Sequence, residues 1–200
     1  RLVVRNRLKE IQPPEKRQKI ETEILLKAHG GFQWAMLSID MIHDGNTTGA
    51  STQSLHRNIS TIPEGLNELY AAILSGASKE EKHQITKLFR WVLFAERPLS
   101  AQELREALAT DQDMDYKTVQ ELRCHDNYSD SLSQFEIRVR HISRGLVEFQ
   151  SREVWEVYEL DGEDWDREAQ FVHQSAADFI LERFLNRVGH GSMSHVHGAG

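Results

Sequence analysis

The feature that most constrains the fold is a change of pattern at Gly145. Before this residue, apolar side chains recur every three or four positions, as they do in helices that bury one face. After it, "LVEFQ" and "EVWEVYEL" alternate between apolar and polar residues, which is typical of paired strands. A third short strand is predicted at 169–172 and a closing helix at 175–185. The second part of the chain therefore runs from helices through a small sheet into one last helix.

Three helices are predicted ahead of this sheet. The first starts at Lys79 and ends before Pro98, the second covers 101–109, and the third covers 132–144. The polar segment "TDQDMDYKTVQELRCHDNYSD" between the second and third reads as an insertion or long loop with one short helical turn at most. Three helices, a β-wing and a closing helix predict a winged-helix domain at 79–186.

Two local signals refine this prediction. Ser100 and Glu103 have the spacing of a capping box, in which the serine hydroxyl and the glutamate carboxylate each bond the other residue's backbone amide. Trp91 and Phe94 flank the apolar stripe of the first helix, so we expect both rings to belong to the core of the domain.

The first part of the chain is predicted to be a helical subdomain at 15–76. One helix ends at Gly30-Gly31, an apolar helix follows, and Pro63 separates a short helix from a longer one. The expected fold class is mainly α with a small β-wing, a helical subdomain followed by a winged-helix domain.

Composition and charge argue against several classes of function. The formal charge of −7 argues against a phosphate-binding surface over the whole chain, and the single cysteine, Cys124, excludes an internal disulfide. The chain has no apolar run near the roughly 18 to 20 residues that cross a bilayer, and we expect no membrane contact and a cytoplasmic location. Because it starts at Arg1 and stops in "VGHGSMSHVHGAG", we expect it to be part of a longer protein.

Five segments in this order resemble a known family. They are "IETEILLKAHGGFQWAMLSID", "LNELYAAIL", "LFRWVLFAERPLSAQELREALA", "ISRGLVE" and "FVHQSAADFIL". Together they span about 20–185 and are similar to the region that follows the nucleotide-binding domain in NACHT-type signalling ATPases, the large STAND proteins abundant in fungi. The second half also resembles the winged-helix domain of GPI inositol-deacylase-like proteins.

The resemblance implies a nucleotide-controlled switch. A NACHT ATPase domain would precede this chain, ankyrin, WD or TPR repeats would follow it, and 187–200 would be the linker to those repeats. The full-length protein would bind ADP or ATP with Mg²⁺ and form a homo-oligomer when activated. This chain has no G-x-x-x-x-G-K-[ST] phosphate loop, so we expect no cofactor, no catalytic residue and no enzyme activity in it alone.

His173 is the main candidate site residue. In the related plant-type switches a histidine at the start of the last winged-helix helix contacts a phosphate of ADP, with an aspartate five positions on, and His173 and Asp178 have that spacing. Exposed amides at a helix start also favour anions. The alternative is that His173 only packs and caps the helix. Gly30 and Gly31 likewise resemble a turn that touches adenine in those relatives, or else form a structural corner.

Other patterns carry weaker signals. His190, His195 and His197 are better read as a flexible tail than as a metal site, and Cys124-His125 has no evident base. The acids of "DQDMDY" lack the rest of a calcium loop, so no metal is predicted. The rival function is that of a DNA-binding winged-helix regulator, because the third helix carries basic residues: Arg138, Arg140, His141 and Arg144.

Overall fold

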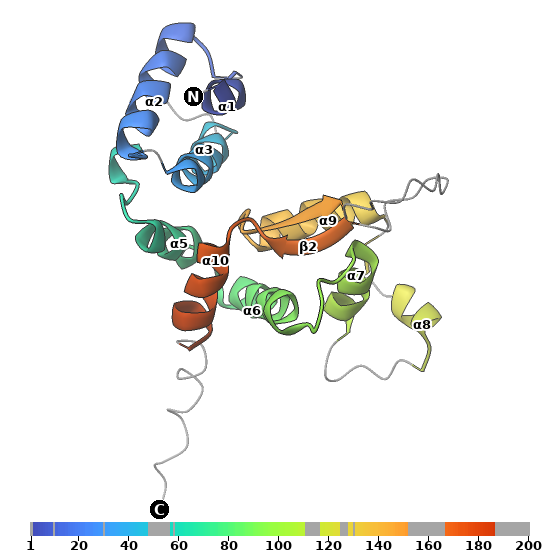
Figure 1. Cartoon of the computed structure of the whole chain (residues 1–200). Coiled ribbons are helices and arrows are strands. Elements are labelled where there is room, and N and C mark those ends of the chain that lie inside the picture. Colours follow the sequence, from blue (N-terminus) through green and yellow to red (C-terminus); the bar gives the residue numbers. More distant parts are fainter. Residues whose placement is uncertain are drawn as a thin grey trace, which may run out of the picture. The chain divides into compact units, whose positions relative to one another are not determined.

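The protein is described by a computed structural model that is mainly helical with a small two-stranded sheet, as the sequence predicts (Figure 1). The residues that the structure describes are 2–9, 11–29, 31–47, 57, 59–110, 117–124, 128–129, 131–151 and 167–186. The chain divides into two compact units between Gly76 and Ala77. The predicted strand "EVWEVYEL" and the expected linker at 187–200 lie outside the described residues.

The first unit is built from helices alone. These are α1 (Leu2–Arg7), α2 (Pro14–Lys27), α3 (Phe32–Thr47) and α5 (Leu66–Ser75), with a helical turn at 59–61. Helix α2 begins at a proline, whose missing amide hydrogen costs nothing in a first turn. Helix α1 packs against α3 and buries Val4, so the unit begins earlier than the expected boundary at residue 15.

Apolar residues from all parts of this unit form its core. Those with no exposed surface include Leu8, Ile11, Ile20, Ile24, Ile39, Ile59, Leu69 and Tyr70. Two side chains hold the turn at 59–63 to the helices. The indole nitrogen of Trp34 donates to the carbonyl of Pro63 at 2.7 Å, and Lys27 Nζ donates to the carbonyls of Ile59 and Ser60 at 2.9 and 3.1 Å.

The second unit starts with the predicted helices. They are α6 (Lys79–Phe94), α7 (Ala101–Ala109), the short α8 (Val119–Arg123) and α9 (Leu132–Ile142). Helices α6, α7 and α9 pack against one another, and α8 contacts α7. The single turn expected in the polar segment is therefore α8, whereas the acids of "DQDMDY" lie in a stretch that the structure leaves undescribed.

Capping boxes begin two of these helices. Ser100 Oγ accepts from the amide of Glu103 at 3.2 Å and the Glu103 carboxylate accepts from the amide of Ser100 at 2.9 Å, which confirms the prediction. Ser78 and Glu81 form the same arrangement before α6. Their spacing is equally visible in the sequence, but it was not used to predict that start.

The sheet pairs β1 (Val147–Ser151) with β2 (Arg167–Phe171) in antiparallel register, with Val147 opposite Phe171. The segment before α7 adds to its edge, because the amide of Ala169 donates to the carbonyl of Leu99 at 2.9 Å. The first predicted strand thus pairs with the third.

The closing helix continues almost directly from β2. It consists of α10 (Gln174–Phe179) and η1 (Ile180–Leu185), in which the hydrogen bonds widen to the π pattern. Phe89 of α6 is fully buried and its ring centroid lies 5.5 Å from that of Phe171 and 5.7 Å from that of Phe184. One buried ring therefore joins α6 to the sheet and to the closing helix.

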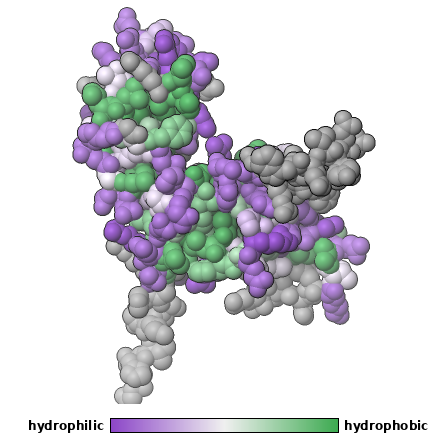
Figure 2. All heavy atoms as spheres, in the orientation of Figure 1, coloured by the Kyte–Doolittle hydropathy of each residue, from purple (hydrophilic) through white to green (hydrophobic). Residues whose placement is uncertain are grey.

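The prediction that Trp91 and Phe94 belong to the core is wrong. Trp91 is 40% exposed and Phe94 is 63% exposed, whereas Ile85, Leu88 and Phe89 on the opposite side of α6 are buried. Figure 2 shows hydrophobic atoms at the surface of both units, between hydrophilic ones. In the part of the chain that was searched, no helix is long and apolar enough to cross a membrane.

Candidate functional site

His173 stands at the beginning of the closing helix, as the sequence predicts. Its backbone is extended, with φ −163° and ψ 148°, and its ring Nδ1 accepts a hydrogen bond from the amide of Ser175 at 3.1 Å. The hydroxyl of Ser175 lies 2.8 Å from the same nitrogen. The side chain therefore caps the helix, which confirms half of the structural alternative, but it is exposed and does not pack in the core.

The cap determines which nitrogen faces outward as a donor. Because Nδ1 accepts from the Ser175 amide, a neutral His173 ring must carry its proton on Nε2. An exposed Nε2–H at the end of β2 is suited to donate to an acceptor outside the unit. The same residue thus completes the helix start and presents a hydrogen-bond donor.

Packing holds this donor in place. The amide of Val172 donates to the carbonyl of Leu146 at 3.1 Å, which ties the residue before His173 to the start of β1. About one and two helical turns further on, the buried side chains of Ala176 and Ile180 anchor the helix that His173 caps. The position of the imidazole is therefore set by the sheet on one side and by the core on the other.

Asp178 bonds to another residue of the helix that His173 caps. Its carboxylate accepts from the side-chain amide of Gln174 at 2.9 Å, one turn earlier on the exposed surface of α10. Gln174 directly follows His173, so Asp178 supports the first turn of the helix through this neighbour. None of the hydrogen bonds described for this helix joins Asp178 to the imidazole.

The glycine corner belongs to the first unit. Gly30 lies outside the described residues. At Gly31, a Cβ would come within 3.0 Å of the carbonyl oxygen of Ala28, a close approach that favours glycine. The left-handed backbone is found at His29, with φ 45°, and not at Gly31. These contacts describe a structural corner, and a role of Gly30 and Gly31 towards adenine stays a prediction.

The basic residues predicted on the third helix lie in α9 or just after it, in different surroundings. Arg144 donates to Glu81 at 2.8 Å, and Arg138 lines a cavity inside the unit. Arg140 and His141 are exposed. Only Arg140 and His141 of the four are thus exposed, and DNA binding by this segment stays a prediction.

The remaining candidates stay without support. Cys124 is exposed, and its neighbour His125 lies outside the described residues, as do His190, His195 and His197. In the part of the chain that was searched, no three His, Cys, Asp or Glu side chains are grouped closely enough to hold a metal ion.

Comparisons with protein-family models, with curated proteins and with solved structures find no match to this chain.

Proposed function

We propose that this chain is the regulatory part of a NACHT-type signalling switch and acts through packing against an ATPase domain of the same protein. Two features support the proposal. One is the resemblance of five segments to that family, and the other is a helical unit followed by the helices α6 to α9, a small sheet and a closing helix. The observation that carries it is His173, whose exposed ring presents an Nε2–H donor at the start of α10.

In this proposal His173 distinguishes two nucleotide states. When ADP is bound to the upstream domain, the imidazole donates to a phosphate oxygen, and α10 is held against that domain. When ATP replaces ADP, the contact is lost, the two parts separate and the protein is free to form a homo-oligomer. In this proposal the second unit supplies the start of α10, and the contact at His173 acts on the rest of the unit through this helix.

The size of the effect follows from one contact. A hydrogen bond to a charged group contributes about 1.5 to 3 kcal/mol when it is made in one state only. Such a difference shifts the equilibrium between the two states by about 10-fold to 150-fold. One histidine is therefore enough to bias the switch without any catalytic role.

The chain alone is not proposed to be an enzyme. The printed sequence has no phosphate loop, so the nucleotide and Mg²⁺ would be held mainly by the upstream domain. We expect titration of the isolated chain with ADP or ATP to show no micromolar binding. In the same proposal, the partners of this chain are the ATPase domain before it and the repeats after it. The whole protein is proposed to be cytoplasmic.

Hydrogen exchange tests the proposal in a protein that carries this chain behind an ATPase domain. The amides at the start of α10, from Ser175 on, should exchange more slowly with ADP bound than with a non-hydrolysable ATP analogue. Helix α2, in the other unit, provides the internal reference. Equal protection of α10 in both nucleotide states would contradict the proposal.

A further inference from the structure

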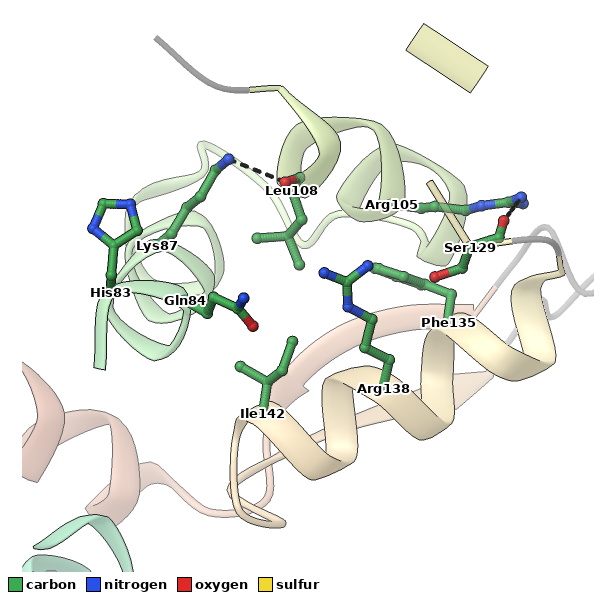
Figure 3. A pocket seen from close by; sticks show the side chains of 9 residues that line it. All are labelled: His83, Gln84, Lys87, Arg105, Leu108, Ser129, Phe135, Arg138 and Ile142. Carbon is green, nitrogen blue, oxygen red and sulfur yellow. Dashed lines mark hydrogen bonds between the residues drawn. The ribbon is translucent and has the colours of Figure 1, made fainter. Parts of the chain in front are cut away.

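A second candidate site lies in the second unit and does not include His173. A cavity of about 120 Å³ opens between α6, α7 and α9 (Figure 3). Its lining includes side chains from all three helices and from the segment before α9: His83, Gln84, Lys87, Arg105, Leu108, Ser129, Phe135, Arg138 and Ile142. None of the nucleotide contacts proposed above involves these residues.

The charged side chains that line this cavity are all of the same sign. Lys87, Arg105 and Arg138 are positively charged. Among the described residues that line it, none carries a carboxylate, although the chain as a whole has a net charge of −7. Cations gathered around one space raise its potential, and walls of low dielectric strengthen the effect. The cavity therefore attracts anions within an otherwise acidic chain.

Two of the cations are fixed by the fold. Lys87 Nζ donates to the carbonyls of Leu108 at 3.0 Å and of Thr110, where it complements the carboxyl end of α7. The Arg105 guanidinium lies 3.9 Å from the ring centroid of Tyr128 and donates to the carbonyl of Ser129. Both charges are held at the wall of the cavity by bonds that a ligand would not need to replace.

Arg138 and Gln84 provide the groups that reach inward. Figure 3 shows the guanidinium of Arg138 and the side-chain amide of Gln84 in the space between the helices, whereas Arg105 extends towards Ser129. A guanidinium is planar and presents paired N–H donors that match two oxygens of one oxyanion. An amide N–H adds a third donor of the same kind.

The volume limits what can enter. About 120 Å³ is roughly ten times the minimum space that holds one water molecule. It is well below the roughly 300 to 1,000 Å³ of pockets that enclose a drug-sized ligand. A single tetrahedral oxyanion group fits this range, and a whole nucleotide does not.

We propose that the cavity between α6, α7 and α9 is a binding site for one phosphate group, with Arg138 as its anchor and Lys87 as a fixed neighbouring charge. The group is either free inorganic phosphate or the phosphate of a larger molecule whose remainder stays outside. This site is independent of the nucleotide switch proposed for His173.

The test is calorimetric titration of the full chain with inorganic phosphate and with O-phosphoserine, against sodium chloride at equal ionic strength. Arg138→Gln should weaken phosphate binding by about 10-fold or more, because it removes a charge-assisted contact. Arg140→Gln is the matched control, since it removes an exposed arginine from the same helix and should leave binding unchanged.

Arg138→Lys keeps the charge, loses the paired donors and should bind with intermediate affinity, which guards against misfolding of the glutamine variant. Equal binding of both ligands would identify free phosphate as sufficient, and tighter binding of O-phosphoserine would identify an attached group. Absence of phosphate binding to the wild-type chain, or equal losses in Arg138→Gln and Arg140→Gln, would overturn the proposal.

Discussion

The hydroxyl of Ser143 accepts a hydrogen bond from the backbone amide of Val147 at 3.2 Å and donates one to the carbonyl of Arg140 at 3.2 Å. Ser143 is fully buried. One side chain therefore joins the end of α9 to the start of β1, where the chain changes from helix to strand.

Replacing Ser143 by alanine should lower the free energy of unfolding by about 1 to 3 kcal/mol, because the buried amide of Val147 loses its partner. Ser75→Ala is the matched control: its hydroxyl also bonds a carbonyl three residues back, but it is exposed. Urea unfolding measures both variants. Equal effects of the two substitutions would show that the bond to Val147 contributes nothing.

The two phenylalanines of α6 should differ in their effect on stability. Phe89→Ala should cost about 3 to 5 kcal/mol, because this fully buried ring contacts both Phe171 and Phe184. Phe94→Ala should cost less than about 1 kcal/mol, because most of its ring is exposed. Chemical denaturation of both variants is the measurement. A large loss in Phe94→Ala would restore the core role that the sequence suggested.

The charge of Glu103 should make the free energy of unfolding depend on pH in the acidic range. Hydrogen bonds from the Arg97 side chain and then from the Ser100 amide lower the pKa of Glu103 from 4.5 to about 2. Between these values the unfolded chain binds more protons than the folded one. The stabilisation is therefore fully present above pH 4.5 and is lost as the pH falls towards 2.

Glu103→Gln tests this, because glutamine can still close the capping box without the charge. Its melting temperature should lie below that of the wild type at about pH 6 and approach it at about pH 3. A difference that stays constant across this range would mean that the pair with Arg97 adds no charge-dependent stability.

The corner after α2 should be more stable with glycine at position 29. His29 is exposed and has a φ of 45°, a left-handed conformation that costs residues with a Cβ about 1 to 2 kcal/mol. His29→Gly should therefore raise stability by up to about 1 kcal/mol after the entropy of the unfolded glycine is counted. His29→Ala should bring no such gain. Thermal unfolding of the wild type and of the two variants is the measurement. A lower melting temperature of His29→Gly would show that the backbone at position 29 is not strained.

Local patterns were enough to predict much of the second unit. The capping box at Ser100 and the first strand after Gly145 depend only on patterns of neighbouring residues, and both are found in the structure. The position of His173 at the start of the closing helix was also predictable, because a short apolar strand is followed there by a helical pattern.

Other features depend on contacts between distant parts of the chain. The sequence predicts Trp91 and Phe94 in the core because they flank the apolar stripe of the helix, but α6 buries the face with Leu88 and Phe89, where the sheet and closing helix pack. The charged cavity was not predictable either. It exists only because α6, α7 and α9 bring separate residues such as Lys87 and Arg138 to one space.

Helix α1 was missed for a similar reason. Helix α1 has only six residues, which is too short a segment for its apolar residues to show a helical period. Its residue Val4 is buried because α1 packs against α3. The sequence also does not reveal that His29, at the end of α2, has a left-handed backbone.

The most direct test of the switch is the rate of ADP release from a protein that carries this chain behind its ATPase domain. His173→Asn separates the two roles of the residue. Asparagine can cap α10 through the Ser175 amide, but its own side-chain N–H lies closer to the backbone than the Nε2–H of the imidazole. We expect this variant to melt close to the wild type and to release ADP about 10-fold to 150-fold faster. His173→Ala should show the same faster release together with a lower melting temperature. An unchanged ADP release rate in a folded His173→Asn protein would contradict the proposed nucleotide contact.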